Sequence, residues 1–282
     1  MKHLICIEKK WKYKLGGYDM PRRFTFDNEI NILEYFRDQK NPPLGLPEND
    51  GNLRIINSLY KDECWNSWSN SSGKDEMPPD FYNRNLSLMI EVMRVDDNAS
   101  NNGSVNALKV KENEMLKELK ETGILDKLSK GAKVTTLANT NLPTEEDHNF
   151  KRYKENFKRV IEKHSKKVDS YRKNHKGYKL IFFVFDESSG SYFEIPNVLN
   201  KEKIKFKSTV EAKLHFFWMD EDFINVIEKS KVDYLIWYKP YNSFKTPNGI
   251  NDELPKVVIY DLSNMETQKI RYNENLMVSS EI

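Results

Sequence analysis

Residues 86–95 restrict the fold of this chain more than any other segment, because their sequence, LSLMIEVMRV, indicates a buried β-strand. Side chains of a strand alternate between its two faces, and apolar residues occupy most positions of both faces here. A strand of this kind is usually central in its sheet and needs a packed layer on each side. Glu91 is the exception in the run. A buried carboxylate without a compensating partner costs several kcal/mol, so the sequence predicts a cation, a hydrogen-bond donor or a proton beside Glu91.

Helix and strand patterns alternate along the chain and predict an α/β fold with a mixed central sheet flanked by helices. Apolar residues at three- and four-residue spacing predict helices at 28–40, 107–119, 144–175 and 220–229. Apolar runs predict strands at 79–82, 86–95, 179–186, 192–195, 232–238 and 256–260, and an ambiguous one at 133–137. Residues 53–60 fit either a strand or a helical turn. No internal repeat is present, so we expect a single α/β domain over residues 1–282.

Length and composition place the chain among ordinary globular proteins. A chain of 282 residues can bury a core without disulfide bonds, and Cys6 and Cys64 have neither metal-site spacing nor the pattern of a disulfide framework. The longest apolar run, residues 180–185, is far shorter than the roughly 18 residues of a membrane-spanning helix. We therefore expect a soluble, cytoplasmic protein with no membrane partner.

Positive charge is concentrated in one segment of a chain that is almost neutral as a whole. The net charge is +2, but residues 150–179 contain twelve lysines and arginines and only three acidic residues. Such an excess on one predicted helix is a candidate surface for a polyanion. A solvated helix face in a lysine-rich chain is the alternative interpretation. The predicted nucleic-acid contacts are Arg94, Lys151, Lys154, Lys158, Lys163 and Lys166.

Two carboxylates lie on neighbouring strands if residues 79–82 and 86–95 form a hairpin. The triplet between the two strands, Asn-Arg-Asn, is typical of a turn and would bring Asp80 and Glu91 together. A divalent metal that assists phosphodiester hydrolysis needs hard oxygen ligands that converge on one point, and two such carboxylates supply them. A nearby lysine would orient the attacking water or stabilise the developing negative charge.

These residues resemble the PD-(D/E)XK nuclease superfamily, which has the restriction-endonuclease-like fold. The resemblance lies in Pro79-Asp80, the short hairpin and Glu91-Val92-Met93, together with the predicted order helix, three strands, helix, strand. It assigns the parts of the chain as a nuclease-like core at 27–186, an N-terminal arm or strand at 1–26 and a C-terminal extension of the sheet at 187–282.

The function that this resemblance implies is that of a divalent-metal-dependent nuclease acting on DNA or RNA phosphodiesters. Asp80 and Glu91 would be metal ligands, joined by the backbone carbonyl of Val92. Either Glu29 or Glu34 on the first helix would complete the site. The implied cofactor is Mg²⁺ or Mn²⁺, the implied partner is a nucleic acid, and a homodimer is an option.

One position departs from the family pattern, because Met93 stands where the family has its lysine and can neither carry a charge nor transfer a proton. Arg94 points to the opposite face unless the strand bulges there. Lys109 and Lys111, on the next predicted helix, are the candidates for a relocated catalytic lysine, together with lysines of the long basic helix. The alternative to a nuclease is therefore a catalytically inactive nucleic-acid-binding or protein-interaction module on the same fold.

Other polar and aromatic residues have simpler interpretations. Asp186 and Glu187 end a predicted strand, where α/β folds commonly place site residues, but a strand-end turn is the commoner cause. His164 lies on the apolar stripe of its helix and is predicted to be a packed core histidine. The aromatic residues at 215–218 and 234–241 are interpreted as core rather than as base-stacking surfaces.

Overall fold

The computed structural model describes most of the chain, namely residues 28–71, 78–97, 149–188, 190–197, 209–242 and 254–280, with Phe26 and the short segments 11–14, 114, 117–118, 121–123, 244–246 and 249–251. The predicted helix at 107–119 and the ambiguous strand at 133–137 lie outside these residues, apart from a few isolated positions of the helix.

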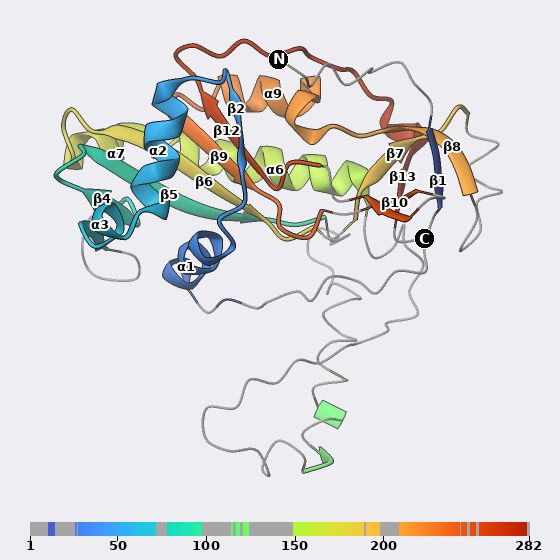
Figure 1. Ribbon diagram of the computed structural model, residues 1–282, viewed down its shortest axis with the longest axis horizontal. Coiled ribbons are helices and arrows are strands. Elements are labelled where there is room, and N and C mark those ends of the chain that lie inside the picture. The colour runs from blue at the N-terminus through green and yellow to red at the C-terminus, as the bar shows by residue number, and fades with distance from the viewer. Residues whose placement is uncertain are drawn as a thin grey trace.

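A seven-stranded mixed sheet forms the centre of the molecule (Figure 1). Its strands, in spatial order, are β2 (Pro43–Leu46), β12 (Val257–Asp261), β9 (Tyr234–Tyr238), β6 (Lys179–Asp186), β5 (Leu88–Val95), β4 (Phe81–Asn83) and β3 (Trp68–Asn70). β5, β6 and β9 are parallel to one another, whereas β3, β4 and β5 form an antiparallel meander. The expectation of a mixed α/β sheet with β5 in its interior is confirmed.

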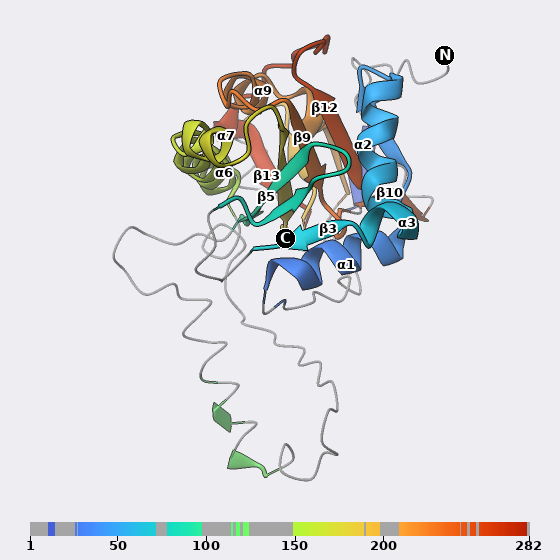
Figure 2. The ribbon, with the colours of Figure 1, turned by 90° about the vertical axis from the view of Figure 1, so that its left-hand side faces the viewer.

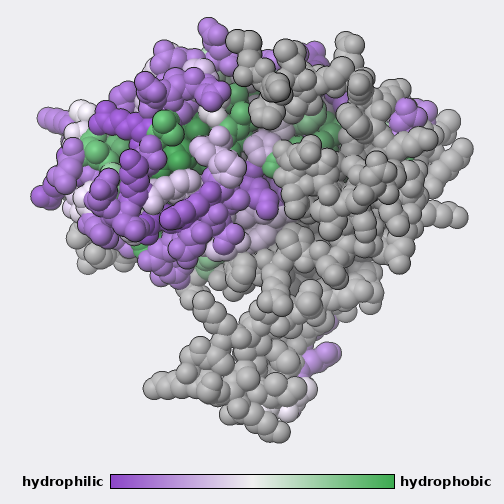
Figure 3. Space-filling model, in the orientation of Figure 1, coloured by the Kyte–Doolittle hydropathy of each residue, from purple (hydrophilic) through white to green (hydrophobic). Residues whose placement is uncertain are grey.

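Helices cover both faces of this sheet, which gives three layers (Figure 2). One layer contains α1 (Glu29–Gln39), α2 (Asp50–Tyr60) and the short α3 (Asp62–Trp65). The other contains α6 (Phe150–Ser165), α7 (Val168–Asn174) and α9 (Glu221–Glu228). The outer surface of the first layer is mostly hydrophilic (Figure 3). None of the helices described is both long enough and apolar enough to cross a bilayer.

Two smaller sheets flank the central one. The larger is antiparallel and has the order β1 (Trp11–Lys14), β8 (Thr209–Leu214), β7 (Tyr192–Glu194) and β13 (Met277–Ser279). The smaller is the hairpin of β10 (Phe244–Thr246) and β11 (Gly249–Asn251). Two short 3₁₀ turns, Phe217–Met219 and Glu274–Leu276, complete the described elements.

Each face of the central sheet has its own apolar core, and β5 contributes to both. Its even-numbered residues from Leu88 to Val92 pack with α1 and α2. Met89, Met93 and Val95 pack with α6 and α7 on the other face. The two-residue alternation predicted for this strand is therefore confirmed, and Glu91 points to the α6 and α7 side.

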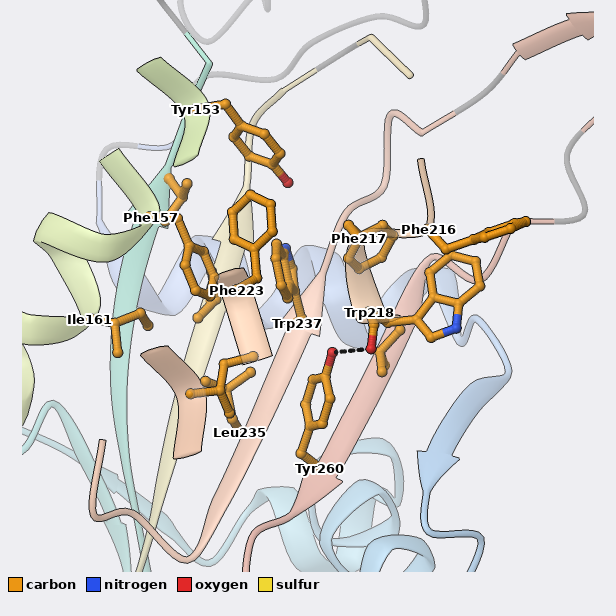
Figure 4. Packing of buried hydrophobic residues seen from close by; sticks show 14 of the residues in the cluster. Tyr153, Phe157, Ile161, Phe216, Phe217, Trp218, Phe223, Leu235, Trp237 and Tyr260 are labelled. Atoms are coloured by element: carbon orange, nitrogen blue, oxygen red, sulfur yellow. Dashed lines mark hydrogen bonds between the residues drawn. The ribbon is translucent and has the colours of Figure 1, made fainter. Parts of the chain in front are cut away.

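Aromatic side chains fill the core between the sheet and α6 (Figure 4). Phe157 stacks on Trp237 with ring centroids 4.4 Å apart, and the ring of Phe223 meets both edge-on. Tyr260 donates a hydrogen bond of 3.2 Å to the carbonyl of Trp218. The residues at 215–218 and 234–238 are buried, so their interpretation as core is confirmed.

The long helix differs from the sequence-based expectation in two respects, and the open alternative at 53–60 is resolved. The long helix was predicted to start at Thr144, but Asn149 has extended backbone angles and caps α6 by accepting hydrogen bonds from the next turn. The same helix was predicted to be continuous, whereas Lys166 and Lys167 separate α6 from α7. Residues 53–60 belong to α2, whose cap is the side chain of Asn49.

Candidate functional site

The β4–β5 hairpin brings the two predicted carboxylates together. Phe81 pairs with Ile90 in the antiparallel register, so the next pair along is Asp80 and Glu91. β4 begins at Phe81, so Val92 of β5 has no backbone partner in β4 and its N–H instead bonds to the side chain of Asp80. The Oδ2 atom of Asp80 accepts that hydrogen bond at 2.8 Å. Asp80 thus lies just before β4 and not within a strand as predicted, but the hairpin places it next to Glu91 as expected.

Glu91 is buried, with 5 % of its surface exposed, and its partners come from the helices above it. The hydroxyl of Tyr171 donates to Oε1 at 2.7 Å, and Nδ1 of His164 lies 2.8 Å from the same oxygen. An ionised carboxylate only accepts hydrogen bonds, so the imidazole donates through Nδ1. The other oxygen, Oε2, is buried and has no hydrogen-bond partner within the part of the chain that the structure describes.

Asp80 has an unusual electrostatic environment. Burial raises the pKa of its carboxyl group to about 7, and the negative charge of Glu91 contributes to the rise. The hydrogen bond from Val92 and the charge of Lys167 lower this pKa, whereas Glu29 raises it further. The charges of two other carboxylates and one ammonium group therefore act on Asp80 at the end of the hairpin.

Burial and the neighbouring charge of Glu91 also raise the pKa of Tyr171. Its hydroxyl therefore keeps its proton and remains a hydrogen-bond donor to Glu91 at physiological pH.

The remaining residues of the predicted metal site lie in different places. Glu29 is the carboxylate of α1 whose charge acts on Asp80, whereas Glu34 is exposed further along the helix. Val92 uses its N–H for Asp80, and its side chain packs with α1 and α2. Lys109 and Lys111 lie outside the described residues.

The two residues after Val92 do not supply a cation beside Glu91. Met93 is 3 % exposed and packs in the α6 core. Arg94 extends to the opposite face, where it donates to the carbonyl of Phe26 and pairs with Glu187 at 3.8 Å. No bulge turns its guanidinium toward Glu91, because β5 and β6 keep their register throughout.

The donor set suits a cation that needs few protein ligands. No group of three or more His, Cys, Asp or Glu side chains is placed to hold a metal ion among the residues described. Mg²⁺ usually retains several waters and takes only one or two carboxylates from the protein, with substrate phosphates as further ligands. Asp80 and Glu91 are two such carboxylates, and Oε2 of Glu91 has no hydrogen-bond partner among the residues that the structure describes.

No family model, curated protein or solved structure matches the chain. The function of the protein therefore has to be inferred from its own side chains.

The outer face of α6 carries the predicted basic surface. Four cationic side chains and two carboxylates line a surface hollow there, namely Lys158, Arg159, Lys163, Lys166, Glu155 and Glu162. Lys151 is also exposed on this helix. Lys154 faces away from this surface and pairs with Asp222 at 2.9 Å and Glu274 at 2.6 Å. Of the predicted contacts on α6, Lys154 thus holds α9 and the C-terminal segment in place.

His164 and Tyr171 were not predicted as site residues. His164 was expected to be a packed core histidine, and it does lie on the buried side of its helix, but its ring is bonded to Glu91. One signal was available in the sequence, since both residues share the apolar stripe that faces the sheet. Along the chain, this helix connects β5 to β6, which are adjacent parallel strands. Such a connecting helix packs on the sheet over these two strands, so its apolar stripe faces β5.

Asp186 is part of a closed buried network at the ends of β6 and β9. Its carboxylate accepts hydrogen bonds from Tyr153, from Ser188 and from Nε1 of Trp237 at 2.9 Å, and Lys239 lies 3.4 Å away. Asp186 has no exposed surface, and Lys239 has 3 %. A buried ion pair with this many donors fixes the strand ends, which agrees with the structural interpretation.

Proposed function

We propose that the protein holds a divalent cation between Asp80 and Glu91 and hydrolyses phosphodiester bonds of a nucleic acid. The observation that carries this proposal is a pair of neighbouring, largely buried carboxylates of which one oxygen, Oε2 of Glu91, has no hydrogen-bond partner among the described residues. The pKa of Asp80 is also raised to about 7. Such an arrangement is costly in the absence of positive charge, and a bound cation relieves the cost.

Mg²⁺ or Mn²⁺ bound there would neutralise charge on the phosphoryl oxygens and lower the pKa of a water molecule. The protein residues hold and orient the substrate. Lys167 lies between α6 and α7 and is the ammonium group whose charge acts on Asp80, so it is available to a phosphate at the same point. Its position makes it a better candidate than Met93 for the cationic role.

The basic face of α6 supports a polyanionic substrate. Lys158, Lys163 and Lys166 line one hollow on the helix that also contributes His164 to the carboxylate site. Lys166 at the end of this face is followed by Lys167, whose charge acts on Asp80, so a phosphate backbone along this face would be led toward the carboxylates. From α1 to β6 the order of the described elements is α1, β2, α2, α3, β3–β4–β5, α6, α7 and β6, so the order that the PD-(D/E)XK resemblance implies is present with β2, α2, α3 and α7 as additional elements.

Cleavage of DNA and RNA in the presence of Mg²⁺, Mn²⁺ or EDTA tests this function. The wild type is expected to cleave at least one of these substrates only with the cation, and Asp80→Asn and Glu91→Gln are expected to lose the activity by about 100-fold or more. Asp38→Asn is the matched control, because it removes an exposed carboxylate on α1 that belongs to no predicted site. Cation-independent cleavage, or a variant at Asp80 that is as active as the control, would refute the proposal.

A second candidate function is a nucleic-acid-binding protein without catalysis, favoured by the buried Met93. It predicts binding that is independent of divalent cations and sensitive to salt. Charge reversal of Lys158, Lys163 and Lys166 would weaken this binding and reduce its dependence on salt, whereas Lys229→Glu on α9 would not. An acidic protein partner would instead be retained on the wild type after nuclease treatment.

A further inference from the structure

We infer that His164 and Tyr171 are positioning residues that fix Glu91, so that its Oε2 atom alone is offered to a cation. This inference rests on the proposed function. It adds the residues that determine how the cation is bound and which cation the site prefers.

The two oxygens of Glu91 are in different situations. Oε1 receives both available hydrogen bonds, at 2.7 Å from the hydroxyl of Tyr171 and at 2.8 Å from Nδ1 of His164. Oε2 is buried but has no hydrogen-bond partner within the described residues. A buried polar atom that lacks a hydrogen bond costs free energy, so the asymmetry indicates that Oε2 is kept for a ligand.

The path of the chain makes this arrangement specific. His164 lies near the end of α6 and Tyr171 lies within α7, seven residues later. A continuous helix would separate two such residues by about 10 Å along its axis, and the interruption at Lys166 and Lys167 lies between them. Both side chains nevertheless meet one oxygen atom. Two donors from two helices restrict the carboxylate more than either could alone.

The surroundings keep the carboxylate in this orientation. Met93 and Phe182 lie in the same apolar core as Tyr171, and the side chain of His164 is only 15 % exposed. An intermediate rotation of the carboxylate would leave the imidazole and the hydroxyl without an acceptor in this core, and a half turn only exchanges two equivalent oxygens. Oε1 is therefore occupied by its two hydrogen bonds, and Glu91 binds a cation through Oε2 alone.

Binding through one oxygen has a consequence for selectivity. Ca²⁺ takes six to eight oxygen ligands and commonly binds a carboxylate through both oxygens, whereas Mg²⁺ accepts fewer protein ligands in octahedral geometry. A Glu91 that is fixed by His164 and Tyr171 therefore favours Mg²⁺ and Mn²⁺ over Ca²⁺. Removing the two donors would free Oε1 and reduce this preference.

Calorimetric titration of the full chain with Mg²⁺, Mn²⁺ and Ca²⁺ tests the inference without relying on activity. His164→Ala and Tyr171→Phe are expected to weaken Mg²⁺ binding by about 10- to 100-fold, the usual effect of losing such a supporting group. Ca²⁺ binding is expected to weaken less. His164→Asn places an amide N–H near the position of Nδ1 and is expected to restore most of the affinity. His175→Asn is the control, because this histidine contacts Tyr82 and Tyr178 instead of Glu91.

The outcomes separate this inference from the proposed function. If the wild type binds Mg²⁺ and cleaves nucleic acid but His164→Ala and Tyr171→Phe bind it as tightly as the wild type, the positioning role is refuted and the function stands. If His164→Asn is as weak as His164→Ala while circular dichroism shows both folded, a hydrogen bond to Oε1 is not what matters, and the role is again refuted. If the wild type binds no divalent cation, the inference and the proposed function fail together.

Discussion

Replacing Asp80 with asparagine is expected to make the folded protein more stable at pH 8 while removing cation binding. The carboxylate at this position is partly buried, lies beside Glu91 and has a pKa raised to about 7. Asparagine has nearly the same shape, carries no charge and keeps a carbonyl oxygen to accept the hydrogen bond from Val92. A residue retained at a cost to stability is typical of a functional site.

The magnitude follows from the pKa. A value of about 7 against an ordinary 3.8 corresponds to about 4 kcal/mol, because each pKa unit is equivalent to about 1.4 kcal/mol. This figure is an upper limit, since Asp80 is not fully buried and water screens part of the interaction. We expect Asp80→Asn to raise the free energy of unfolding by roughly 1–4 kcal/mol at pH 8.

The sign depends on pH in a defined way. The pKa of Asp80 is higher in the folded state than in the unfolded state, so its stabilising contribution is complete below about 3.8 and is lost as the pH rises through about 7. The advantage of Asp80→Asn over the wild type is therefore expected to be small near pH 4 and largest at pH 8.

Urea unfolding in EDTA between pH 4 and pH 8 measures this difference, with Asp38→Asn as a control for an exposed carboxylate of α1. Addition of Mg²⁺ is expected to stabilise the wild type by about 2.7 kcal/mol at a hundred times its dissociation constant, and to leave Asp80→Asn unchanged. An Asp80→Asn variant that is less stable than the wild type at pH 8, or a difference that does not vary with pH, would refute the reasoning. In that case the carboxylate serves mainly to cap the N–H of Val92.

Three further substitutions test the packing around the site. Glu91→Leu leaves an imidazole and a hydroxyl buried without an acceptor and is expected to lower the free energy of unfolding by about 2–4 kcal/mol, whereas Glu91→Gln keeps an acceptor and should cost less; equal losses in urea unfolding would contradict this account. Trp237→Ala removes the fully buried ring that stacks on Phe157 and is expected to cost about 3–5 kcal/mol by the same measurement. Lys239→Met leaves Asp186 without its cation and is expected to cost about 3 kcal/mol, and a neutral effect would mean that the other donors compensate the charge completely.

The sequence predicted the parts of the site that depend on local periodicity. The alternation in β5 and the turn after β4 determine that Asp80 and Glu91 are neighbours, and both patterns lie within a span of sixteen residues from 80 to 95. The alternation also places Glu91 on the same face as Met89 and Met93, because the side-chain period of a strand is two.

The partners of Glu91 could not be predicted, because they depend on how α6 and α7 pack on β5. His164 is 73 positions from Glu91 in the sequence. The interruption between α6 and α7 contains neither proline nor glycine, the residues that usually predict a helix break. The start of α6 was misplaced for a related reason. Thr144 and Asn149 are both residue types that commonly cap helices, and it is the extended backbone of Asn149 and its side-chain hydrogen bonds that mark the start of α6.

β5 pairs with β6 over eight positions, whereas β4 covers only three positions of β5. The hydrogen bond from the N–H of Val92 to the carboxylate of Asp80 is therefore the last one between the two strands of the hairpin, and a side chain accepts it because the backbone pairing of β4 begins only at Phe81. Protonation of the Asp80 carboxylate, or binding of a cation to it, changes the strength of this hydrogen bond. The occupancy of the site is thus coupled to how firmly the hairpin closes, and amide exchange at Val92 should report it without any substrate.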